Sequence, residues 1–146
     1  MTTMRILIER LEEGASAWTP AEETACFKLA KQQIATHGYR WNPRVDVSSS
    51  TVVVDALVKG LFNGREGTLV IEVARGRTGD GSQMEAGASF QTGKKWTVEV
   101  VASKPIPQTK EKQWPPDAFA FGLEAGDMLV QIYEMAIREG FSEEAP

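Results

Sequence analysis

Alternating apolar and polar positions dominate the middle of the chain. Residues 51–61 carry an apolar side chain at every second position, several of them β-branched, and residues 68–75 repeat the alternation. This pattern is typical of strands with one buried face. A helix beginning after Ser50 would also gather apolar residues on one face, but the β-branched residues and Gly60 lower helix propensity. We therefore predict two strands.

The segment between these strands indicates how they pair. Residues 63–67 are rich in types that tolerate positive φ, as a hairpin loop of four or five residues requires. If Phe62 lies opposite Gly67, then Val58 faces Ile71 and both apolar sets share one side of the sheet. Pattern and register therefore agree on an antiparallel hairpin.

Two more strands are predicted after a glycine-rich connection at 75–82. Placing Phe90 opposite Trp96 again brings two apolar sets to one side, and Val45 and Val47 suit a short edge strand. The result is an antiparallel meander of four to five strands. The alternating apolar residues of the two later strands are Met84, Ala86, Ala88 and Phe90, followed by Trp96, Val98, Val100 and Ala102.

Two helices are predicted on either side of the strands. Residues 19–22 combine an N-cap threonine, a proline suited to the first helical position and a capping-box glutamate, so a helix runs from 20 to about 37. A long second helix begins at or just after Asp117 and ends at Gly140. Its polar residues form a narrow stripe, so its apolar surface is broader than packing on one sheet requires. Either it lies between the sheet and another helix, or it contributes to a dimer.

Two segments fit neither the sheet nor these helices. Residues 3–13 have apolar side chains at helical spacing, while Ile6 and Ile8 would suit a strand, so both assignments remain open. Residues 103–116 contain four prolines and no periodicity, which predicts an extended crossover.

Together these elements predict an α+β fold: an antiparallel meander sheet packed by the helix of the N-terminal half and the long C-terminal helix. A chain of 146 residues is expected to form one domain, 1–146. No apolar run is long enough to span a membrane, and the N-terminus is unlike a secretory signal. The single cysteine, Cys26, cannot form an internal disulfide, so we expect a cytoplasmic protein.

Residues with catalytic or metal-binding chemistry are few. One cysteine and one histidine cannot make a zinc site of the usual kinds, and Cys26 and His37 lie ~16 Å apart along the predicted helix. No cofactor is expected. Lysines and tryptophans interleave near 94–96 and 110–114, as in single-strand binders, but the net charge of −4 does not favour nucleic acid as a partner.

Asp55 and Glu72 lie on the polar side of neighbouring predicted strands, about 7 Å apart as diagonal neighbours. Glu99 has the same parity. The pair resembles the divalent-metal site of the PD-(D/E)xK nucleases, which implies metal binding by Asp55 and Glu72. Ala74, however, stands where that family has its catalytic lysine. The competing interpretation is the ordinary polar face of an antiparallel sheet.

Since no catalytic set emerges, we expect a non-enzymatic protein-interaction module: an adaptor, inhibitor or assembly subunit that acts through its surface. Its partner would be another protein or a second copy of the chain. The predicted contacts are Ile106 and Trp114 in the crossover, and Tyr133 and Ile137 as exposed residues of the last helix. One alternative is a helix-grip domain that binds a small apolar ligand between sheet and helix. Another is a degenerate nuclease-like fold that binds nucleic acid.

Overall fold

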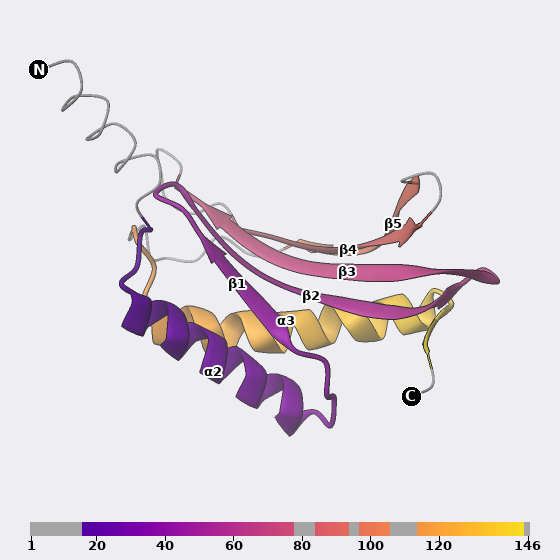
Figure 1. The fold of residues 1–146 in the computed structure, drawn as a ribbon, viewed down its shortest axis with the longest axis horizontal. Helices are drawn as coiled ribbons and strands as arrows, with labels where there is room; N and C mark the ends of the chain where they lie inside the picture. Colours follow the sequence, from indigo (N-terminus) through magenta and orange to yellow (C-terminus); the bar gives the residue numbers. More distant parts are fainter. Residues whose placement is uncertain (1–15, 78–83, 94–96, 106–113, 145–146) are drawn as a thin grey trace, which may run out of the picture.

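A computed structural model describes residues 16–77, 84–93, 97–105 and 114–144, which form two helices and a six-stranded antiparallel sheet (Figure 1). The sheet order is β1-β2-β3-β4-β5, and β6 pairs with the far end of β2. The predicted α+β meander is confirmed, and β6 is an addition to it. The helices are α2 (Pro20–Thr36) and α3 (Ala118–Arg138), and the strands are β1 (Pro43–Val47), β2 (Thr51–Phe62), β3 (Arg65–Gly76), β4 (Met84–Thr92), β5 (Thr97–Pro105) and β6 (Phe141–Glu143).

Both helices begin where the sequence predicts. The Thr19 hydroxyl accepts a hydrogen bond from the Glu22 amide at 3.2 Å, and the Glu22 carboxylate accepts one from the Thr19 amide at 3.0 Å, which completes the capping box. The Asp117 carboxylate accepts from the Ala120 amide at 2.9 Å and caps α3 in the same way. These bonds satisfy amides that a helix N-terminus leaves without partners.

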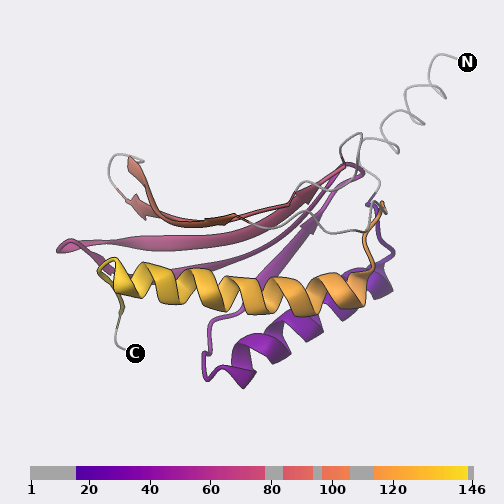
Figure 2. The ribbon, with the colours of Figure 1, turned by 180° about the vertical axis from the view of Figure 1, so that it is seen from behind.

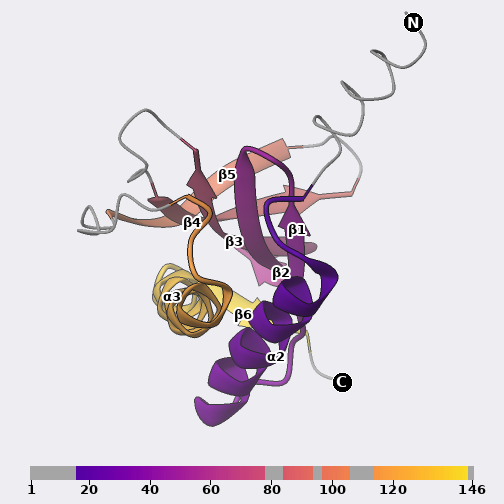
Figure 3. The same ribbon diagram turned by 90° about the vertical axis from the view of Figure 1, so that its left-hand side faces the viewer.

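The two helices lie on the same side of the sheet (Figures 2 and 3). Helix α3 packs on the sheet, and α2 packs on α3 and β1. Most of the broad apolar surface of α3 is thereby covered within the chain, as the intramolecular interpretation predicts, while Phe119, Leu123 and Ile137 stay exposed. Small residues permit close approach, because a Cβ added to Gly126 would lie 2.8 Å from the Ala30 carbonyl oxygen. No helix in the described part of the chain is both long and apolar enough to cross a membrane.

The predicted register of the central hairpin is wrong by two residues. Phe62 pairs with Arg65, not with Gly67, and Val58 pairs with Leu69. The loop is a two-residue turn in which Asn63 and Gly64 have φ angles of +52° and +77°. Asn-Gly favours this tight turn because its twist matches that of the flanking strands. A shift of two residues preserves parity, so the apolar sets still share one side.

The predicted pairing of β4 with β5 is also wrong. Phe90 pairs with Glu99, and the register shifts between Ala88 and Ser89, which leaves Val101 as an extra residue in β5. Such a bulge reverses the parity of the residues before it. Val98 and Val100, which the alternation assigns to the core, are therefore exposed. Glu99 instead faces the helix side, where it forms an ion pair with Arg65.

Four sequence predictions fall wholly or partly outside the described residues: the assignment of 3–13, the orientation of Trp96, the extended crossover at 103–116 and the contact at Ile106. Elsewhere the apolar parity of β2, β3 and β4 is confirmed. Val54, Ile71 and Val73 have no exposed surface and lie on the same side of the sheet.

Candidate functional site

No described element covers the side of the sheet opposite the helices. We call it the open face. In Figures 1 and 2, the backbone of β4 and β5 curves away from the helices at both ends. The strand registers place seven charged residues on the open face: Arg44, Asp46, Asp55, Lys59, Glu66, Glu72 and Glu85. The five acids and two bases make it acidic.

A line of mostly apolar residues crosses the open face from strand to strand. Leu57 pairs with Val70, Val70 with Ser89, and Ser89 with Val100, and we call these four residues the cross-strand row. Leu57 is 45% exposed and Val100 is 79% exposed. Four strands spaced about 4.8 Å apart give the row a length of ~14 Å. Leu61 and Val98 add exposed aliphatic side chains to this face, and that much exposed apolar surface is unusual for the solvent side of an antiparallel sheet.

Carboxylates border the row on one side. Asp55 pairs directly with Glu72, and Glu85 is the diagonal neighbour of Glu72 on β4. Asp55 accepts two hydrogen bonds from Arg44, at 2.9 and 3.0 Å, whereas Glu72 and Glu85 form no ion pair with a described residue. A hollow of about 240 Å³ lies between these two glutamates and Val100.

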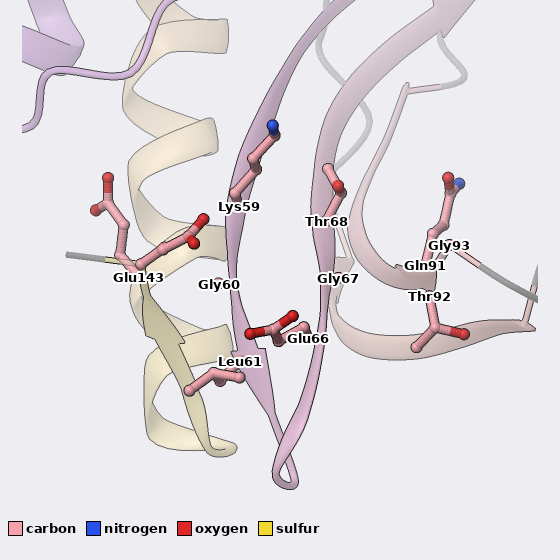
Figure 4. Close-up of a pocket in the computed structure, with 11 residues that line it drawn as sticks. Lys59, Gly60, Leu61, Glu66, Gly67, Thr68, Gln91, Thr92, Gly93 and Glu143 are labelled. Carbon is pink, nitrogen blue, oxygen red and sulfur yellow. The ribbon is translucent and has the colours of Figure 1, made fainter. Parts of the chain in front are cut away.

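A larger groove of about 580 Å³ lies on the other side of the row, toward the hairpin turn (Figure 4). We call it the hairpin groove. It crosses β6, β2, β3 and β4, and its lining side chains are Lys59, Leu61, Glu66, Thr68, Gln91, Thr92, Glu143 and Glu144. Leu61 is 42% exposed and adds apolar surface next to the row. Glu66 and Glu144 line the groove against one lysine, whereas the Glu143 carboxylate accepts the hydrogen bond of Tyr133 on the helix side.

On the open face, the hydrogen bonds to Asp55 and the charge of that carboxylate raise the pKa of the Arg44 guanidinium, and three other groups with shifted pKa values lie on the helix side of the sheet. Burial raises the pKa of the Cys26 thiol to about 12, and such a thiol is a poor nucleophile. Burial and a hydrogen bond to Glu143, at 2.8 Å, raise the pKa of Tyr133. Burial and the nearby Glu134 raise that of Tyr39. All three groups keep their protons at neutral pH and act as packing and hydrogen-bonding groups.

The contact residues predicted from sequence differ in how exposed they are in the structure. Tyr133 is 2% exposed, so its predicted exposure is wrong: its ring packs against Tyr39 and Trp41 in the core. Trp114 is partly buried and also packs against the core, whereas Ile137 is 43% exposed on α3. None of the three lies on the open face. The signal that could have identified this face is Leu57, a large aliphatic residue on the polar parity of β2.

The nuclease-like pair is closer than predicted, because Asp55 and Glu72 are direct rather than diagonal partners. Both oxygens of Asp55, however, are occupied by the Arg44 guanidinium. Among the residues that the structure describes, no three His, Cys, Asp or Glu side chains lie close enough to hold a metal ion. With Ala74 in place of the lysine, the residues present do not fit the metal site of that family.

Between α3 and the sheet, where a helix-grip ligand would bind, side chains fill the interior. Ala125, Leu129 and Ile132 of α3 have no exposed surface, nor do Val54 and Ile71 of the sheet beneath them. Comparisons with protein-family models, curated proteins and solved structures find no match, and a function must be inferred from this chain's own residues.

Proposed function

We propose that this chain is a non-enzymatic protein-interaction module that binds a partner protein through the open face. The observation that carries the proposal is the cross-strand row. Its residues Leu57 and Val100 stay 45% and 79% exposed, and a hollow lies on each side of the row. Burying an aliphatic side chain of this size against a partner stabilises a complex by roughly 1.5–3 kcal/mol. Contiguous exposed apolar surface commonly marks interaction sites. A cytoplasmic location, consistent with the single cysteine, is part of the proposal.

Site-specific photo-crosslinking in the native host tests this function. A photoreactive amino acid replaces Leu57 or Val100 on the open face, or Glu124 on the exposed side of α3 as the control. We expect the same protein adduct at the first two positions and none at Glu124. Absence of adducts at Leu57 and Val100, or the same adducts at all three positions, would refute the proposal.

A pair of variants distinguishes binding through the open face from binding through the contacts predicted on α3. Val100→Asp and Ile137→Asp each place a carboxylate at an exposed aliphatic position, and both chains should fold because neither side chain is in the core. We expect Val100→Asp to abolish the adduct formed at Leu57 and Ile137→Asp to leave it unchanged. The reverse result would assign binding to α3.

A further inference from the structure

The open face has a geometry and a charge pattern that fit one kind of partner. We infer that it binds a cationic amphipathic helix laid across the strands, with apolar side chains on the cross-strand row and lysines or arginines on either side. This inference rests on the proposed function and names its partner by chemistry.

The length of the row matches a helix surface. The row runs ~14 Å from β2 to β5. In an α-helix, residues i, i+4, i+7 and i+11 share one face and span about 16 Å at 1.5 Å per residue. Ser89 interrupts the row with a small side chain, and the adjacent hollow of about 240 Å³ provides room for an aliphatic side chain of the partner. A helix crossing the strands can therefore place one apolar residue over each of them.

The charges on both sides of the row favour a cationic partner. Glu72 borders it on one side, with Glu85 one open-face position beyond Gly87 on β4, and Glu66 lies beyond Thr68 on the side of the hairpin groove. Of the two cations placed on the described open face, Arg44 is already paired with Asp55, which leaves Lys59. Lysine and arginine also cover apolar surface with their stems while their charged ends reach carboxylates. Complementary charge of this kind sets partner choice and orientation.

The same charges disfavour two other occupants. A second copy of the chain docked face to face would bring two acidic surfaces together, and a nucleic acid would place phosphates against carboxylates. Neither repulsion applies to a basic helix. Both alternatives are nevertheless outcomes of the experiment.

The experiment uses the full chain and synthetic peptides of about 18 residues, long enough to place four leucines on one helical face. The first peptide has lysines flanking the leucines, the second has glutamates in their place, and the third scrambles the sequence of the first. Fluorescence anisotropy gives each Kd, and amide shifts of the labelled protein locate the site. We expect the first peptide to bind at least about tenfold more tightly than the other two and to shift Leu57, Val70 and Val100.

Charge-neutralised variants identify the carboxylates. Glu72→Gln with Glu85→Gln should weaken binding of the lysine peptide about tenfold, and added salt should abolish most of that difference. The control is Glu124→Gln with Glu139→Gln, at an exposed position of α3 and at its C-cap, and it changes the net charge by the same amount as the first pair. It should alter the Kd by less than about twofold. Equal losses in both double variants would overturn the inference, because binding would then follow net charge alone.

Five other results would also overturn it. In the peptide experiment they are equal binding of the scrambled peptide, equal binding of the glutamate peptide, and amide shifts confined to α2 and α3. The other two are saturable binding of single-stranded DNA and self-association through Val100. If the lysine peptide fails while crosslinks form at Leu57 and Val100, the partner chemistry is wrong and the proposed function stands. If crosslinks fail at both positions, the proposed function is wrong.

Discussion

Gly126 lies where α3 passes close to α2, and replacing it with alanine has two opposing effects on stability. Helix propensity alone predicts that Gly126→Ala stabilises α3 by about 1 kcal/mol. The added Cβ, however, would lie 2.8 Å from the Ala30 carbonyl oxygen and 2.8 Å from Gln33 Cβ, whereas ordinary contact begins at 3.4 Å. The helices must then separate by about 0.6 Å, because backbone atoms cannot rotate out of the way.

That separation weakens the packing of α2, whose buried residues Cys26, Ala30 and Ile34 are at most 1% exposed. It also disturbs the hydrogen bond from Gln33 to Asp127, which measures 2.9 Å. Overpacking a dense interior typically costs about 1–3 kcal/mol. After the gain in propensity, we expect Gly126→Ala to lower the free energy of unfolding by about 1 kcal/mol, and Tm by about 2–4 °C.

Urea unfolding followed by circular dichroism measures this change. The pair Glu124→Ala and Glu124→Gly gives the Ala–Gly difference at an exposed position of the same helix, expected at about 1 kcal/mol in favour of alanine. Gly76→Ala, which meets no atom within 4 Å, should be neutral or slightly stabilising. If Gly126→Ala proves as stable as the parent chain or more so, the close helix contact is not a constraint on the fold.

The remaining predictions concern the core, a cap and the C-terminal strand. Because burial raises the Cys26 pKa from 9.0 to about 12, the folded chain holds the thiol proton more tightly than the unfolded chain. The free energy of unfolding should therefore fall as pH rises above 9.0, by up to about 1.4 kcal/mol per pH unit, and the slope should shrink in Cys26→Ala, as urea unfolding at several pH values would show. Thr19→Ala should cost about 1 kcal/mol through loss of the cap while Thr19→Ser retains it, and equal stabilities in thermal unfolding would contradict this. Tyr133→Phe removes the bond to Glu143 and should cost about 1 kcal/mol, with faster amide exchange in β6 as its specific sign.

Sequence periodicity predicts most of this fold because a helix or strand with one buried face has apolar residues at regular spacing in the sequence. The alternation in β2 survives a register error of two residues, since the side-chain period of a strand is two. The capping box at Thr19 is equally direct, because it consists of residues four positions or fewer apart. Strand β6 is absent from the prediction because three residues are too few to display a period.

The candidate site could not be predicted because it depends on features that local patterns do not encode. The extra residue Val101 reverses the parity of β5. The alternation of Val98, Val100 and Ala102 contains no sign of this bulge. Tyr133 belongs to an apolar flank of α3 that looks free in the sequence and is covered by residues about 90 positions away, among them Tyr39 and Trp41. Such long-range packing decides which aliphatic residues remain at the surface.

The bulge also bears on function. Without it, the alternation would place Val98 and Val100 against α3, where each would contribute roughly 1.5–2 kcal/mol of burial. The fold instead turns them outward, at 55% and 79% exposure, and sets Glu99 beside Arg65 on the helix side. Exposing two valines therefore costs stability that the sequence pattern could have retained. A departure from local consistency is most readily explained where it builds a site, and here it completes the cross-strand row with Val100.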